Sequence, residues 1–136
     1  MSTRAEIQNQ INNVDRNIWA TNEQIRILQE HLANVEKART ELSQIRSWAT
    51  EDAMGLNRLD CENPQFWKGS CQNKCATDYN NCTPPVVAYS NRLDAWGSEL
   101  ITTRNRFDAE LRSQQSSLAA LTSNRQHLVN LLSQLN

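Results

Sequence analysis

The sequence predicts an all-α protein, a long antiparallel two-helix hairpin of the coiled-coil type with a cysteine-stapled tip that contains a short helix. Apolar residues recur at alternating spacings of four and three in two stretches of similar length. All four cysteines lie between these stretches, and the chain of 136 residues has only three glycines. We expect a single elongated domain over 1–136, with a first arm at 3–58, a tip at 59–83 and a second arm at 84–135.

The first arm is expected to begin at once, because Thr3 followed by Glu6 is a capping-box pattern. Its predicted seam consists of Ile7, Ile11, Val14, Ile18, Ile25, Leu28, Leu32, Val35 and Leu42. Thr21, Arg39 and Arg46 interrupt this seam. The two arginines either pair with acidic groups of a partner or cover apolar surface with their stems while the charged heads reach water, and we favour the second interpretation.

The tip holds Cys61, Cys71, Cys75 and Cys82. Asn63 followed by Pro64 disfavours a continuing helix, and Ser70 can cap a short helix from about Cys71 to Tyr79. A spacing of four puts Cys71 and Cys75 on one face of that helix. Two disulfides, each joining a helix cysteine to Cys61 or Cys82, would staple the tip, although the sequence does not choose among the three possible pairings.

Zinc or free thiols are the alternatives at the tip. Zinc ligands usually come in close pairs, and here only Cys71 and Cys75 are close. The two histidines, His31 and His127, lie on the arms and are expected to be solvated. We therefore favour disulfides over free thiols and over zinc, and we expect no cofactor and no resident metal.

The second arm is expected to start with Thr83 as cap and Pro84 in the first turn. Its seam consists of Leu93, Leu100, Phe107, Leu111, Leu118, Leu121, Leu128, Leu132 and Leu135, interrupted by Arg104, Gln114 and Arg125. Folding back at the tip would bring Trp48 near Trp96, Val35 near Phe107, and Ile7 near Leu135.

Five further apolar residues lie beside the seams. They are Trp19, Ile27, Ile101, Val129 and Leu131. They either give loose coverage of the hairpin's own seam or form a docking face, and we favour docking because small cores usually need oligomerisation or staples. The expected partners are therefore proteins, either copies of this chain or other subunits of an assembly.

Composition argues against several function classes. The net charge is −1 with both signs interspersed, so no basic run suits nucleic acid. No apolar run reaches the roughly 18 residues of a membrane span. The first residues lack the apolar core of a secretory signal, which indicates synthesis in a cytosol. Because disulfides are rare there, clustered cysteines suggest a working place in an extracellular particle such as a virion, or non-classical secretion.

No catalytic constellation is visible, since a nucleophilic cysteine needs a nearby base and both histidines are distant in sequence. The sequence thus favours a non-enzymatic structural subunit, most plausibly of a virion capsid, neck or tail. A zinc- or redox-responsive hairpin is an alternative.

A second alternative comes from Trp67-Lys68-Gly69, which resembles the W-x-G turn of the WXG100 and LXG-associated helical hairpins. This resemblance implies a substrate or targeting partner of a type VII-like secretion system, with Trp67 and Gly69 forming the turn and a recognition element. The arms are longer than is usual in that family, and a cysteine cluster is not part of its pattern. The other interpretation is that Trp67 and Gly69 simply pack within the tip.

Overall fold

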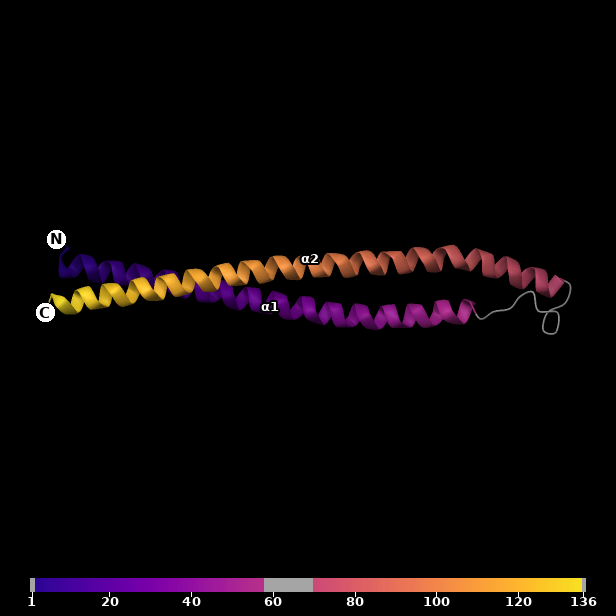
Figure 1. The fold of residues 1–136 in the computed structure, drawn as a ribbon, viewed down its shortest axis with the longest axis horizontal. Helices are drawn as coiled ribbons and strands as arrows, with labels where there is room; N and C mark the ends of the chain where they lie inside the picture. Colours follow the sequence, from indigo (N-terminus) through magenta and orange to yellow (C-terminus); the bar gives the residue numbers. More distant parts are fainter. Residues whose placement is uncertain (1, 58–69, 136) are drawn as a thin grey trace. The chain divides into compact units, whose positions relative to one another are not determined.

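The computed structural model describes residues 2–57 and 70–135, with side chains except at 53–57, 70–72 and 75. Two helices, α1 (Arg4–Asn57) and α2 (Ser70–Gln134), pack against each other as a helical hairpin (Figure 1). Within the described ranges there is no strand. The predicted all-α fold is therefore confirmed.

The chain divides into two compact units, each built from one segment of each helix. Unit 1 consists of Met1–Val35 and Thr103–Asn136, and unit 2 consists of Glu36–Thr102. The start of α1 and the end of α2 lie at the same end of unit 1 (Figure 1). The expectation of a single domain over 1–136 stays a prediction.

The start of α1 is fixed by the predicted capping box. The backbone N–H of Glu6 donates to the hydroxyl of Thr3 over 3.2 Å, and the backbone N–H of Thr3 donates to the Glu6 carboxylate over 2.9 Å. Both groups would otherwise be left without partners in the first helical turn. The sequence-based start of the first helix is confirmed to within a residue.

The core of unit 1 is a cluster of Ile7, Ile11, Val14 and Leu128. Five partly buried side chains pack against this cluster, namely Ile18, Leu121, Val129, Leu131 and Leu132. The alternating four-and-three spacing explains the cluster, because residues so spaced stay on one side of a helix. Leu28 and Val35, further along α1, are buried at the same spacing. In contrast, Leu135, the last seam position predicted for the second arm, lies just past the end of α2 and is 45% exposed.

Unit 2 has a smaller core than unit 1. Among its described side chains, Leu42 of α1 and Leu93 of α2 are the buried hydrophobic ones. Gly97 lies where α2 comes close to α1, since a Cβ placed on it would be 3.7 Å from Leu42 Cδ2 and 3.6 Å from Arg46 Nη1. The packing of this unit therefore depends on few apolar side chains.

The tip differs from the prediction, because α2 begins at Ser70 and continues through Pro84 and Pro85. A separate short helix ending near Tyr79 and a new helix starting at Thr83 are both wrong. Half-buried side chains continue the stripe of α2 towards its start, at Ala76, Tyr79, Thr83 and Val86. Their spacing of three, four and three leads on to buried Leu93 two turns later.

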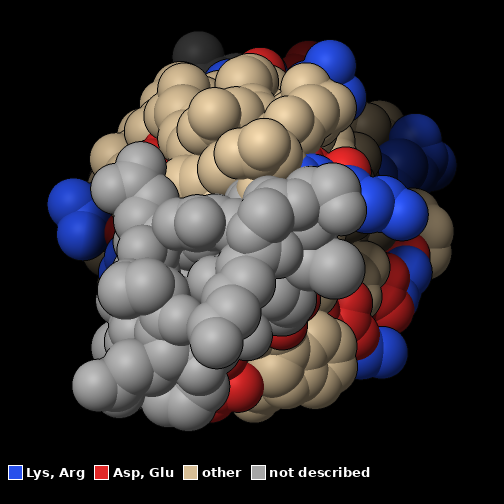
Figure 2. Space-filling view, turned by 90° about the vertical axis from the view of Figure 1, so that its right-hand side faces the viewer, with Lys and Arg blue, Asp and Glu red and all other residues tan. Residues whose placement is uncertain are grey.

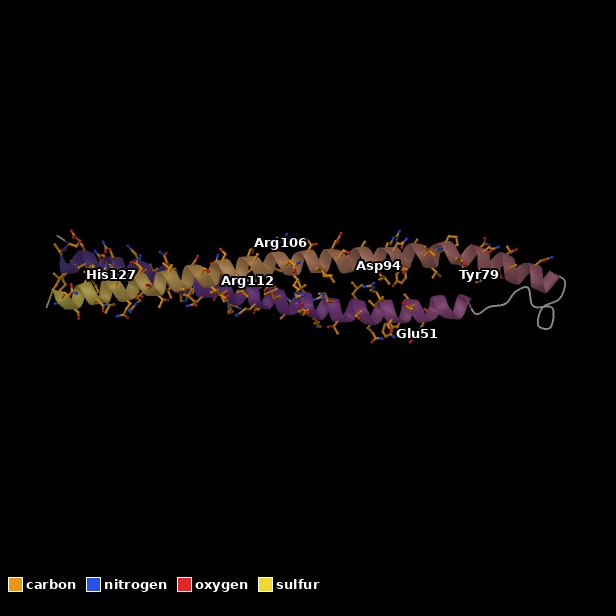
Figure 3. The ribbon with its side chains drawn as sticks, viewed as in Figure 1. Glu51, Tyr79, Asp94, Arg106, Arg112 and His127 are labelled. Carbon is orange, nitrogen blue, oxygen red and sulfur yellow. The ribbon has the colours of Figure 1, made fainter. Side chains whose placement is uncertain are left out.

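The helix tolerates its two prolines because both are exposed. Each proline lacks an N–H and so leaves the carbonyl four residues earlier, of Asn80 or Asn81, without its helical donor. Asn80 and Asn81 are themselves exposed, so water can reach these carbonyls. The ribbon of α2 bends near Tyr79 (Figure 3), as expected where proline rings crowd the preceding turn.

Replacing Gly97 by alanine should stabilise unit 2. The added methyl group would meet its nearest neighbours at 3.6 and 3.7 Å, which are ordinary van der Waals distances. Alanine also removes the cost of about 1 kcal/mol that glycine carries inside a helix. We expect a gain of about 0.5–1 kcal/mol in the free energy of unfolding, measured by urea denaturation followed by circular dichroism. A loss of stability would mean that the two helices are closer at this point than described.

Candidate docking surfaces

Large exposed hydrophobic side chains gather in unit 2. Trp48 of α1 is 56% exposed, and Trp96 and Tyr89 of α2 are 51% and 47% exposed. Val87 and Ile101 of the same unit are also largely open to solvent. Single exposed apolar residues are ordinary on soluble proteins, but a group of them indicates a surface that binds something.

The five residues predicted to dock a partner fall into two classes. Trp19 is 71% exposed, and Ile101 is exposed as well. Ile27 is half-buried. Val129 and Leu131 are half-buried against the core cluster of unit 1, so they cover the seam of their own unit. The docking role of all five stays a prediction.

Two shallow grooves run beside the helices of unit 2. The larger, of about 650 Å³, is lined mainly by polar residues of α1 between Glu36 and Ser47, with Ile101 from α2. The smaller, of about 240 Å³, lies between the helices. It is lined by Ala49, Asp52, Pro85, Val86 and Tyr89. The second groove is the more apolar and opens beside exposed Tyr89.

Arg125 and Arg46 each form an ion pair with a residue of the other helix. In unit 1 Arg125 of α2 donates from Nε to the carboxylate of Asp15, and this contact raises the pKa of the Arg125 guanidinium. In unit 2 Arg46 donates to Asp94, which lies between the helices in Figure 3. All four side chains are 43–57% exposed, so solvent screens both pairs and each adds little to the stability of the fold. Their main effect is on register, because each pair forms only in one alignment of the helices.

The seam arginines of α1 differ in their surroundings. Arg39 is half-buried and pairs with Glu36 one turn earlier on its own helix. Arg46 is exposed and pairs across to Asp94. Both contacts lie within the chain, so neither arginine needs a partner protein to balance its charge.

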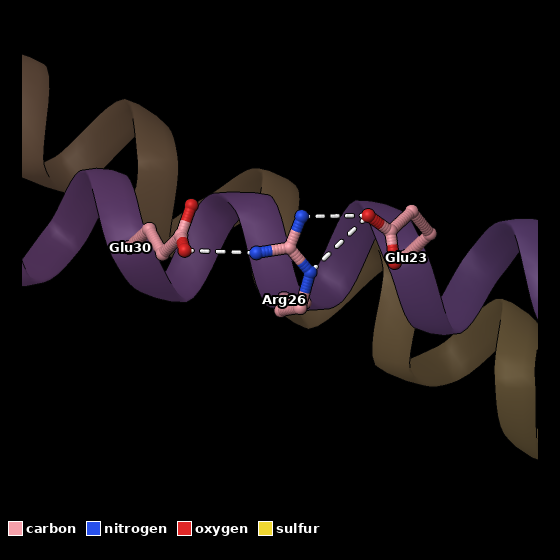
Figure 4. Close-up of polar contacts among 3 residues, drawn as sticks. All are labelled: Glu23, Arg26 and Glu30. Carbon is pink, nitrogen blue, oxygen red and sulfur yellow. Dashed lines mark hydrogen bonds and ion pairs between the residues drawn. The ribbon is translucent and has the colours of Figure 1, made fainter.

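A charged cluster on α1 lies in unit 1 (Figure 4). The Arg26 guanidinium donates to the Glu23 carboxylate over 2.6 Å and to the Glu30 carboxylate over 2.8 Å. The hydrogen bond and charge of Arg26 lower the pKa of Glu23, and the pKa of Arg26 is raised in turn. Glu23 and Glu30 each lie about one helical turn from Arg26, so these contacts stabilise α1 itself.

Because its pKa is lowered on folding, Glu23 stabilises the folded chain above its ordinary pKa of 4.5. This contribution is lost as the pH falls through the lowered value. Glu23→Gln should therefore reduce the stability difference between pH 7 and pH 3, by a small amount because the group is exposed. Thermal melts at both pH values measure this difference, with Glu99→Gln as an exposed control. Equal differences in the two variants would contradict the prediction.

Both histidines are exposed, as the sequence indicated. The ring of His31 nevertheless lies against Phe107 of α2, with 5.1 Å between the ring centroids. This contact keeps His31 in the packing of unit 1. Among the described residues no group of histidine, cysteine or acidic side chains is arranged to hold a metal ion.

The described part of the tip includes one cysteine side chain, Cys82, which is a free and exposed thiol. Cys71 and Cys75 lie on the same continuous helix as Cys82. At 1.5 Å per residue, Cys75 is about 10 Å and Cys71 about 16 Å along α2 from Cys82. A disulfide needs Cα atoms within roughly 7 Å, so Cys82 cannot bond to either while α2 is intact. The predicted pairs that used Cys82 with a helix cysteine are therefore incompatible with this helix, and Cys61, Trp67 and Gly69 lie outside the described residues.

Charges of both signs are spread around the end of the molecule that faces the viewer in Figure 2. Outside the area covered by grey atoms, neither sign gathers into a patch on that face. No helix among the described residues combines the length and the apolar character needed to cross a membrane. No protein-family model, curated protein or solved structure matches the chain.

Proposed function

We propose that this chain is a non-enzymatic structural subunit that docks through one of its helical faces into a larger protein assembly. The observation that carries the proposal is the set of large hydrophobic side chains left exposed in unit 2, which includes Trp48 and Trp96. Leaving two tryptophans exposed to water costs free energy, and unit 2 has few buried side chains to offset this cost. Covering them in an assembly would regain this free energy.

The alternating seam supports a further part of the proposal, that the helices wind around each other as a coiled coil. The polar seam residues Thr21, Arg104 and Gln114 would then disfavour other alignments of the helices and other partners, although they lower the stability of the coiled coil. Mixed charge and polar seam positions suit a spacer or connector in which shape and register matter more than chemistry. Protein partners are expected, with no nucleic acid and no membrane.

A virion capsid, neck or tail is the setting we favour. The support is the cysteine content: four clustered cysteines suit a particle that is assembled in reducing surroundings and released into oxidising ones. The exposed thiol of Cys82 would be reduced during assembly and open to oxidation afterwards.

The test is fractionation of particles and lysate from cells that produce the chain naturally. The full-length chain should sediment with a large particle, and Trp48→Ala combined with Trp96→Ala should move it to the top of the gradient. Leu135→Ala is the control, since Leu135 is apolar and exposed but lies in unit 1 and is not among the predicted docking residues. A natural chain that stays at the top of the gradient would contradict an assembly role.

The second candidate is a substrate or targeting partner of a type VII-like secretion system. It is favoured by the Trp67-Lys68-Gly69 motif between two helices. Replacing Trp67 or Gly69 should then abolish export by a system that carries the chain. Export that is unchanged in both variants would remove this candidate.

A further inference from the structure

Four residues of α1 in unit 2 form a row on one face of the helix. They are Glu41, Ile45, Trp48 and Asp52, spaced by four, three and four residues. This spacing keeps side chains on a single helical face. Ile45 is half-buried, and the other three are exposed. The row is therefore an acidic residue, two apolar residues and a second acidic residue, all accessible from solvent.

A matching row lies on α2. It consists of Tyr89, Arg92, Trp96 and Glu99, spaced by three, four and three residues, and all four are exposed. Tyr89 and Asp52 line the same groove, which places the two rows on the same side of unit 2. We name the eight residues of these two rows the aromatic face.

The register of the helices shows which residues of the aromatic face are level with each other. The two helices run in opposite directions, and Arg46 of α1 pairs with Asp94 of α2. A residue of α1 and a residue of α2 therefore lie at the same height along the hairpin when their numbers sum to about 140. Trp48 is then level with Arg92, and Ile45 with Trp96. At the two ends of the face, Asp52 is level with Tyr89, and Glu41 with Glu99.

The aromatic face is large enough to supply most of the apolar part of a dimer interface. An aromatic side chain offers about 150–250 Å². Since Trp48, Trp96 and Tyr89 are each about half exposed, they present about 300 Å² together. A standard interface buries about 800 Å² per partner, of which a little over half, about 450 Å², is apolar. The three aromatic rings thus provide about two thirds of that apolar area, before Ile45 and the groove beside Tyr89 are counted.

We infer that the occupant of the aromatic face is a second copy of this chain, so that two copies of unit 2 pack face to face into a four-helix arrangement. The inference rests on the proposed docking role and names its first partner. Closed two-fold symmetry is the usual form of a homodimer, and it requires a surface that complements itself. The order of residues along the two rows has this property.

Two two-fold arrangements are possible, and both suit the tryptophans. When the two-fold axis runs parallel to the helices, Trp48 contacts Arg92 of the second copy, and Trp96 contacts Ile45 of the second copy. With the axis across the helices, Trp48 meets Ile45 of the second copy, and Trp96 meets its Arg92. In either case each indole packs on an aliphatic side chain or stacks with a guanidinium, which attracts the face of the ring.

Both arrangements also leave one unfavourable contact, at Glu41. It meets Glu99 of the second copy when the axis runs along the helices, and Asp52 when the axis runs across them. Like charges at an exposed rim weaken association modestly, and salt screens them. The dimer should therefore be somewhat tighter at high salt, and removing this repulsion should tighten it at low salt.

The test is sedimentation velocity of the full-length chain at several concentrations. We expect a reversible dimer in the micromolar range. Trp48→Ala and Trp96→Ala should each weaken it by at least about thirtyfold, because each loss occurs twice in a symmetric interface. Leu135→Ala should leave the dissociation constant unchanged, since Leu135 is exposed but lies in unit 1, and circular dichroism would establish that all variants stay helical. A chain that is monomeric up to about 100 µM, or equal effects of Leu135→Ala and Trp96→Ala, would overturn the inference.

Charge reversal separates the aromatic face from other modes of association. Glu41→Lys should tighten the dimer roughly threefold to tenfold in either arrangement, since the lysine would face an acidic residue. Glu99→Lys should do so only if the axis runs along the helices, and Asp52→Lys only if it runs across them. No tightening by Glu41→Lys would contradict this face as the interface.

The outcome for the dimer can be told apart from the outcome for the assembly role. A monomer that still sediments with a large particle would overturn the second-copy inference and leave the proposed function standing. A dimer that is never found in a particle would support the inference and count against the assembly.

Discussion

Replacing Leu128 by alanine is expected to lower the free energy of unfolding of unit 1 by about 2–5 kcal/mol, the usual range for a buried leucine. Leu128 is the α2 member of the core cluster, in contact with the isoleucines and valine of α1. A two-helix unit has little further core to compensate, so the two helices should separate in this unit. Urea denaturation followed by circular dichroism measures the change.

The matched control for this substitution is Leu135→Ala. Leu135 lies seven residues after Leu128, one residue past the end of α2, and the sequence predicts it in the same seam, but its side chain is 45% exposed. Its truncation should cost less than about 0.5 kcal/mol, as at ordinary surface positions. Similar losses for Leu128→Ala and Leu135→Ala would mean that the cluster is not the core of unit 1.

The seam could be predicted because it depends on local geometry alone. A spacing of four and three keeps residues on one side of a helix whatever the rest of the chain does. Of the polar interruptions, Thr21, Arg39 and Gln114 are half-buried, whereas Arg46 is exposed. The all-α class and the start of α1 at its capping box follow from equally local signals.

The secondary structure of the tip was harder to predict, because two local sequence signals conflicted. Thr83 followed by Pro84 is a strong helix start, and it outweighed the weakly apolar stripe of Ala76, Tyr79 and Val86 in the sequence-based assignment. The seam, extended backwards from Leu93 at its own spacing, leads to Val86, Thr83, Tyr79 and Ala76. This extension was the signal that could have identified one continuous helix.

The candidate surface was only partly predictable, since it depends on which side of each stripe the neighbouring helix covers. Val129 and Ile101 both flank a seam, yet Val129 packs on the core cluster and Ile101 is exposed. Tyr89 was not identified from sequence, because a single tyrosine beside a seam carries no signal of its own. Its exposure beside Trp96 becomes meaningful only in the register set by Arg46 and Asp94.

Replacing both Pro84 and Pro85 by alanine is expected to stabilise unit 2 by about 3–6 kcal/mol, since each proline inside a helix costs about 3 kcal/mol relative to alanine. The new N–H groups at 84 and 85 would donate to the carbonyls of Asn80 and Asn81 and restore two helical hydrogen bonds. Both side chains are exposed, so no packing is lost. Thermal denaturation measures the gain, and hydrogen exchange should show newly protected amides at 84 and 85.

This substitution also decides between one continuous helix and a helix that begins at Thr83. In the second case Pro84 would occupy the first helical turn, where its missing N–H costs nothing. Alanine there would change stability by less than about 1 kcal/mol and leave the amides at 84 and 85 in fast exchange. The control is Asn91→Ala, at an exposed position of the same helix. It measures the gain in stability that alanine gives through helix propensity alone, which is at most about 0.7 kcal/mol. A double-alanine variant no more stable than Asn91→Ala would therefore place the start of the helix at the prolines and return Cys82 to the end of a separate tip.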